Sequence, residues 1–175
     1  AYKNNEFDIV GLAAEDLATV KADATLSKEA MIYPGSCTFA IMYHQQKEPF
    51  NDPKVRQAFS MAFDREKWVA DVLKGLGSPT QTWIPKGYPG YKEGEKRWPF
   101  DPAAAKKALS ESKYGSADKL PPITLTFADT PRNRVRFEWL AAKWKEVLGV
   151  SVKLNPVEPT TYTALTKDSK TAPQV

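Results

Sequence analysis

A chain of 175 residues with 42% apolar and 11% aromatic residues can bury one ordinary core, which indicates a single globular domain and excludes a disordered tail. The 25 basic and 21 acidic residues give a net charge of +4, but the two signs alternate and indicate a solvated surface more than a nucleic-acid-binding patch. No apolar run approaches the ~18 residues of a membrane span. The sequence starts with neither a Met nor a signal peptide, so we expect a processed start or a piece of a longer protein.

The first quarter of the chain predicts two strands and one short helix. FDIVGL (7–12) begins with a short strand, and AEDLATVKAD (14–23) follows at helical spacing. SCTFAIMYH (36–44) is rich in β-formers and apolar on both faces, which predicts a central strand. The only cysteine, Cys37, lies in this run, so we expect a buried thiol and no disulfide framework, and the redox compartment stays open.

Two capped helices and a long loop follow. Asp52 is a good N-cap with Pro53 at the first helical position, and Asp64 can cap a second helix that ends at Gly75 and Gly77. Residues 78–99 are rich in proline, glycine and aromatic residues. A loop of this length in a compact domain is more often functional than a plain connection.

The second half of the chain predicts a βαβ unit. FDPAAAKKALSES (100–112) repeats the Asp-Pro cap of a helix. A strand at 123–129, a helix at 131–148 and a strand at 150–154 then indicate neighbouring parallel strands with a right-handed crossover. A further helix is expected at 159–168, and APQV (172–175) looks like the approach to a strand. The expected fold class is α/β.

Few residues suit catalysis or metal binding. His44 is the only histidine, at the end of a predicted strand, and no cysteine cluster, nucleophile elbow or paired carboxylates accompany it. It is either a strand-end histidine satisfied by the protein or a ligand contact, because strand ends in α/β sheets face ligand crevices. A hydrolase with His44 as its base would need a partner that the sequence does not supply.

Basic and aromatic residues are the other candidates. Lys74 lies in KGLG, which lacks the ending of a phosphate loop and reads as a helix stop, so Lys74 either reaches an anion or is solvated. Trp83 either stacks on a ligand or pins the long loop to the body.

Three arginines stand at the beginning of the helix at 131–148. Cations there are unfavourable to the helix dipole unless an anion lies nearby. That anion is a ligand carboxylate or phosphate, or an internal Asp129 or Glu138, and Arg132 is nearest the helix N-terminus. The same arginines, with Trp83 and the tyrosines of the long loop as stacking platforms, leave a nucleic-acid-binding module as the alternative function.

The segment EPFNDPKVRQAFSMAFDREKWVADVLKGLGSP (48–79) resembles the extracellular solute-binding proteins of the oligopeptide and dipeptide type, with their Pro-Phe, Asp, Val-Arg-x-Ala and Asp-Arg pattern. IPKGYPGY, FDPAAAKKALSES and WKEVLGVSVKL follow in the same order. The resemblance implies a type II periplasmic-binding-protein fold with a mixed sheet and flanking helices. Residues 1–175 would be one lobe of a two-lobed protein.

The same resemblance implies a function and a site. A non-enzymatic parent would capture a peptide or similar small solute and pass it to an ABC permease, without cofactor or metal. It would be periplasmic or extracellular, anchored as a lipoprotein. The implied ligand-binding positions are the strand end, the Lys74 turn with the aromatic loop, and the loop before the long helix: Tyr43, His44, Gln45, Lys74, Trp83, Asp129, Arg132 and Asn133. The isolated lobe is expected to have negligible peptide affinity.

Overall fold

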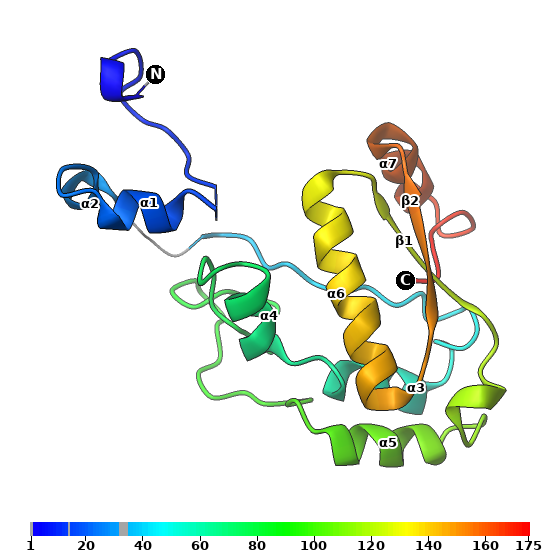
Figure 1. Ribbon diagram of the computed structural model, residues 1–175. Coiled ribbons are helices and arrows are strands. Elements are labelled where there is room, and N and C mark those ends of the chain that lie inside the picture. Colours follow the sequence, from blue (N-terminus) through cyan, green and yellow to red (C-terminus); the bar gives the residue numbers. More distant parts are fainter. Residues whose placement is uncertain (1, 14, 32–34) are drawn as a thin grey trace.

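Two parallel strands and the helix that joins them form the centre of the structure. The computed structural model describes residues 2–13, 15–31 and 35–175. β1 (Ile123–Ala128) pairs in parallel with β2 (Val152–Val157), and α6 (Pro131–Leu148) connects them (Figure 1). Thr130 caps α6 by accepting a hydrogen bond from the Asn133 amide, and Gly149 ends the helix with a left-handed φ of 73°. The predicted βαβ unit is confirmed.

The core lies between this unit and a layer of helices below it. α6 turns Leu140 and Trp144 inward, and both are fully buried. The indole Nε1 of Trp144 donates to the Phe59 carbonyl oxygen at 3.2 Å, and the two rings meet edge to face at 4.9 Å. Phe59 belongs to α3 (Pro53–Met61), so this contact joins the two layers. Trp144 therefore serves packing between the layers.

The three helices predicted from aspartate caps begin where the sequence indicates. The side chains of Asp52, Asp64 and Asp101 each accept a backbone hydrogen bond at the start of a helix. These helices are α3, α4 (Arg65–Asp71) and α5 (Pro102–Ser110). Residues 78–99 contain no helix or strand, as predicted. A short 3-10 helix, η2 (Ala117–Lys119), precedes β1.

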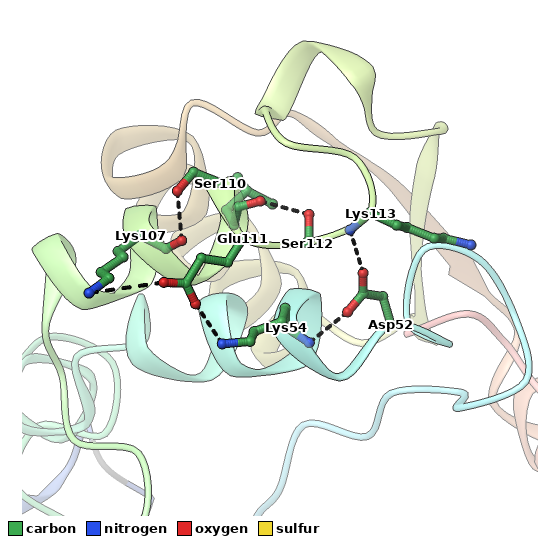
Figure 2. A network of polar contacts seen from close by, with 8 residues as sticks. Asp52, Lys54, Lys107, Ser110, Glu111, Ser112 and Lys113 are labelled. Atoms are coloured by element: carbon green, nitrogen blue, oxygen red, sulfur yellow. Dashed lines mark hydrogen bonds and ion pairs between the residues drawn. The ribbon is translucent and has the colours of Figure 1, made fainter.

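Asp52 also ties α3 to the end of α5 (Figure 2). One carboxylate oxygen accepts from the Lys54 amide at 2.7 Å, and the other accepts from the Lys113 amide at 2.8 Å. Lys54 in turn forms an ion pair with Glu111 at 2.6 Å. A residue that looks like a simple helix cap therefore also fixes the position of a segment 61 residues further along the chain.

The strand predicted at residues 7–12 is wrong. These residues adopt no strand, and Ile9 is 89% exposed. The N-terminal part holds only η1 (Tyr2–Asn4), α1 (Leu17–Ala22) and α2 (Leu26–Glu29), and it stands apart from the body of the protein (Figure 1). β propensity produces a strand only where a neighbouring strand supplies hydrogen-bond partners, and residues 7–12 have none in the described part of the chain.

The central strand predicted at residues 36–44 is also not formed. The segment is irregular in hydrogen bonding, and Cys37 is exposed, which corrects the expected buried thiol. The sheet among the described residues has only β1 and β2, both parallel, so the antiparallel part of a mixed sheet does not form there. The last residues do approach the sheet: the Val175 carbonyl oxygen accepts from the Thr126 amide at 3.0 Å.

The helix predicted after β2 is α7 (Pro159–Lys167), which packs against β1. Glu158 caps it by accepting hydrogen bonds from the Thr161 amide, at 2.9 Å, and from the Thr160 hydroxyl. These hydrogen bonds favour the carboxylate and lower the pKa of Glu158 to about 2.

Replacing Asp52 by Ala should lower the free energy of unfolding more than replacing Asp64 by Ala. Loss of a cap costs about 1 kcal/mol. Asp52→Ala also removes the acceptor of the Lys113 amide, whereas Asp64 caps α4 alone. Urea unfolding of the two variants measures the difference. Equal losses would show that the bond to Lys113 contributes no stability.

The Glu158 cap should weaken in acid. Because folding lowers the pKa of Glu158, its contribution is complete above the unfolded value near 4.5 and is lost as the pH falls toward 2. The unfolding midpoint in urea should therefore drop less between pH 5 and pH 2.5 in Glu158→Gln than in the unchanged protein. Glu15→Gln, which removes an exposed carboxylate, is the control. An equal drop of the urea midpoint between pH 5 and pH 2.5 in all three proteins would show that the ionised Glu158 cap does not stabilise the fold.

Candidate functional site

The beginning of α6 separates the three arginines into different roles. Arg134 forms a two-pronged ion pair with Asp129, both contacts at 2.6 Å, and the hydrogen bonds that the guanidinium donates to the Asp129 carboxylate raise the Arg134 pKa. Asn133 donates its side-chain amide to the Ala128 carbonyl oxygen at 2.9 Å. Asp129 and Asn133 therefore hold the loop between β1 and α6 in shape. The internal anion that the sequence left open is Asp129, and its partner is Arg134.

Arg132 and Arg136 remain without a carboxylate partner in the described part of the chain. They lie one helical turn apart, on the same side of α6. The Arg136 guanidinium sits over the Phe39 ring at 5.2 Å. Partial burial lowers the Arg136 pKa, and the positive charge of Arg132 lowers it further. Two like charges held close together at a helix N-terminus make this surface attractive to an anion.

Phe39 also lines a cavity of about 500 Å³. Its walls are formed by residues 38–41, Tyr43, the end of α3 and the long loop, and the lining residue Trp83 is 68% exposed. The Thr38 hydroxyl donates to the Trp83 carbonyl oxygen at 2.8 Å, which fixes this part of the loop to the wall. The Trp83 backbone therefore holds the loop, while the exposed indole is left on the surface, and stacking of the indole on a ligand stays a prediction.

Arg65 forms part of the cavity wall and was not among the predicted site residues. Its guanidinium donates to the Ser60, Phe63 and Trp98 carbonyl oxygens at 3.3–3.5 Å. Burial lowers the Arg65 pKa, and no ion pair among the described residues involves it. The sequence signal for Arg65 was the Asp-Arg pair at the start of α4, which favours a structural role, with Asp64 as the helix cap.

At the predicted strand end, residues 43–45, the side chains of Tyr43 and His44 contact the protein itself. The Tyr43 ring stacks on Phe50 at 4.8 Å, and burial raises the pKa of its hydroxyl. His44 donates from Nε2 to the Ser169 carbonyl oxygen at 2.8 Å and accepts the Gln46 amide at Nδ1, at 3.3 Å. Both ring nitrogens of His44 are hydrogen-bonded within the protein, so the ring is satisfied there and is not placed to act as a base. Gln45 is exposed beside it.

Lys74 lies apart from these residues. It follows α4 with a left-handed φ of 50° and is exposed, so it belongs to the helix stop that the sequence indicated. The structure thus brings the start of α6 and the cavity with Tyr43 and Trp83 together through Phe39. It does not bring His44, Gln45 or Lys74 into that cavity wall.

Comparison with known proteins gives the family. Residues 1–173 match the family model described as bacterial extracellular solute-binding proteins, family 5 Middle. The chain belongs to this family. It is 29% identical to the dipeptide-binding protein of Escherichia coli (strain K12) over 157 residues, covering 89% of this chain and 29% of that protein. It is also 29% identical to the periplasmic oligopeptide-binding protein OppA of Salmonella typhimurium, covering 92% and 30%.

Solved structures agree on the fold. OppA of Burkholderia pseudomallei aligns with a TM-score of 0.76 at 24% identity, covering 97% of this chain and 34% of that one. The open, unliganded murein tripeptide-binding protein MppA aligns with a TM-score of 0.73 at 27% identity, covering 93% and 32%. The predicted type II periplasmic-binding-protein fold is confirmed. The chain spans about a third of the length of the proteins it matches.

Family membership favours solute binding over the nucleic-acid-binding alternative. Within the described residues, no helix combines the length and apolar character needed to cross a bilayer. The same residues contain no group of three or more His, Cys, Asp and Glu side chains arranged to hold a metal ion.

Replacing Trp83 should leave stability nearly unchanged, in contrast to Trp144. Surface substitutions usually change the free energy of unfolding by less than about 0.5 kcal/mol, whereas truncation of a buried tryptophan costs about 3–5 kcal/mol. Urea unfolding of Trp83→Ala and Trp144→Ala tests this. A loss above about 2 kcal/mol for Trp83→Ala would show that the indole serves packing and is not free to meet a ligand.

Proposed function

We propose that this chain is a ligand-binding lobe of an ABC-transporter substrate-binding protein whose parent captures a peptide and delivers it to a permease. The observation that carries the proposal is the pair of arginines, Arg132 and Arg136, without a carboxylate partner in the described residues. Arg136 lies over the exposed ring of Phe39. A peptide offers the matching chemistry, because it has a carboxylate at one end and side chains that stack on aromatic surfaces. The names of the relatives, which bind dipeptides and oligopeptides, support the same ligand class.

The ligand's carboxylate would meet Arg132 first. Arg132 is exposed at the first turn of the 18-residue helix α6, where the helix dipole also favours an anion. Asp129 and Asn133 would act indirectly by holding the loop in place. Trp83 would stack on a ligand side chain, and Tyr43 would support the cavity wall from the core side.

The remaining sequence-derived positions have weaker support. Lys74, His44 and Gln45 stay candidates for contacts with the other lobe or with a longer ligand. At His44 the contact would come from nearby backbone groups, because the ring is already hydrogen-bonded to Ser169 and Gln46.

The ligand would be held between this lobe and a second one. A ligand that binds the closed arrangement more tightly than the open one shifts the hinge equilibrium toward closure, which the permease can recognise. No bond is made or broken in this scheme, so the protein would not be an enzyme and would need no cofactor. The parent would work in the periplasm or outside the cell, anchored as a lipoprotein.

Peptide binding to the full-length parent tests the carboxylate contact. Arg132→Ala should weaken binding of a tripeptide at least tenfold, which corresponds to about 1.4 kcal/mol. Arg134→Ala is the matched control, because that guanidinium already pairs with Asp129. The same tripeptide with an amidated C-terminus lacks the carboxylate. It should therefore bind weakly, and with equal affinity, to the unchanged parent and to Arg132→Ala.

Two outcomes of calorimetry would contradict the proposal. Equal effects of Arg132→Ala and Arg134→Ala would remove Arg132 from the site. Micromolar or tighter binding of a peptide by the 175-residue chain alone would show that one lobe suffices, against the expectation from a shared cleft.

A further inference from the structure

The cavity lined by Phe39 and Trp83, called here the loop cavity, has apolar walls on several sides. The side chains of Phe39, Ile41, Phe63, Trp83 and Ile84 all line it. The Phe39 and Trp83 side chains are 51% and 68% exposed, so much of their ring surface is open to a ligand. A volume of about 500 Å³ lies within the range of small-molecule sites in proteins. The walls therefore suit a ligand with an apolar or aromatic body.

The charged side chains of the loop cavity are mostly basic. Arg65, Lys92 and Arg97 line it, and Glu95 is the only carboxylate among the described residues that do so. Arg97 Nε donates to a Glu95 carboxylate oxygen at 2.7 Å, so this acid already has a basic partner. Neither Arg65 nor Lys92 forms an ion pair with a described residue. The cavity wall therefore carries two positive charges beyond the pair of Arg97 with Glu95.

The Arg65 guanidinium is half-buried, and its hydrogen bonds are long. It donates to the Ser60, Phe63 and Trp98 carbonyl oxygens and to the Ser60 hydroxyl, all at 3.3–3.5 Å. The usual N–H···O distance is about 2.9 Å. Arg65 Nε makes no hydrogen bond with a described residue. A guanidinium in this state gains more from a carboxylate than a fully solvated one does, because screening by water is weaker.

Gln81 adds an uncharged donor to the wall of the loop cavity. Its Oε1 accepts from the Trp98 amide at 3.1 Å, which fixes the side-chain amide. Its Nε2 has no partner among the described residues. The Thr82 hydroxyl on the same wall already donates to the Ile84 carbonyl oxygen at 2.9 Å. The free groups of Gln81 and Lys92 are thus donors, and a carboxylate, which only accepts, is their complement.

We propose that the loop cavity binds an organic carboxylate, that is, an apolar body that ends in one carboxylate group. The body would lie against Phe39 and Trp83. The carboxylate would be attracted by Arg65 and Lys92 and would accept from Gln81 Nε2. Two sources offer this chemistry, a free organic acid and an acidic side chain of a captured peptide, and only the second rests on the proposed function.

Titration of the isotope-labelled 175-residue chain, followed by NMR, tests the chemistry. Phenylpropionate should shift the signals of the Gln81 and Thr82 amides and of the Trp83 indole. Phenylpropionamide keeps the body but carries no charge, and acetate keeps the charge but has no body. Both should bind at least about tenfold more weakly than phenylpropionate, because a hydrogen bond to a charged group is stronger than a neutral one and apolar contact adds to it.

Two pairs of variants locate the site. Gln81→Glu keeps an acceptor for the Trp98 amide but replaces the free donor with a negative charge, so phenylpropionate should bind at least about tenfold more weakly. Gln46→Glu makes the same charge change at an exposed residue outside the cavity wall and should have no effect. Lys92→Ala should weaken binding, whereas Lys86→Ala, an exposed lysine of the same loop that does not line the cavity, should not.

Three results would overturn the proposal. They are equal binding of phenylpropionate and phenylpropionamide, equal effects of Gln81→Glu and Gln46→Glu, and shifts confined to the amides of residues 130–136. The last result would place the anion at the start of α6 and leave the loop cavity without a ligand. Lys92→Ala and the amide comparison decide the question even if Gln81→Glu does not fold.

Calorimetry on the full-length parent separates the two sources. Tripeptides with one glutamate, at each of the three positions in turn, are compared with their glutamine counterparts. Tighter binding of a glutamate tripeptide that is lost in Gln81→Glu supports the site as a subsite for a peptide side chain. Equal binding of each pair, with phenylpropionate still bound, supports a site for a free organic acid. If no tripeptide binds, the proposed function fails, and the titration with phenylpropionate still decides this proposal.

Discussion

The contact between Trp144 and Phe59 holds the two layers of this protein together. Trp144 is the largest fully buried side chain, and its indole satisfies its only hydrogen-bond donor on the backbone of α3. Apolar burial on this scale dominates folding energetics, at about 25 cal/mol per Å². A buried indole donor without a partner would cancel part of that gain. The position of α6 over α3 is therefore set by packing and by one directional bond together.

Because α6 is fixed at its buried second half, its beginning is held at a defined place on the surface. The loop before it is tied down by Asn133 and by the pair of Asp129 with Arg134. Arg132 and Arg136 are then presented outward beside Phe39. The positive charge that the helix dipole disfavours is thus neutralised at Arg134, and at the other two arginines no carboxylate of the described residues compensates it. Arginine side chains within residues 132–136 thus differ in whether they have a carboxylate partner. This difference gives the surface its proposed preference for a carboxylate.

Local signals predicted the helices well and the strands less well. The caps at Asp52, Asp64 and Asp101 and the stop at Gly149 act within one turn, so the sequence near each helix end is sufficient to place it. The sequence predicted β1 and β2 correctly, because the helix between them brings the two strands side by side. Residues 7–12 and 36–44 have similar β propensity, but a strand also needs a neighbour, and neither segment obtains a full one among the described residues.

The sequence by itself determined the helical block from Asp52 to Gly77, the βαβ unit and the resemblance to solute-binding proteins, because these depend on neighbouring residues and ordered motifs. Only the tertiary structure decided which arginine is paired, that Asp52 reaches Lys113, and that the His44 ring is bound by Ser169. The Asp52 and His44 contacts join residues 61 and 125 positions apart. Such partners are set by how packed elements meet in space, and no periodicity or spacing along the chain encodes them.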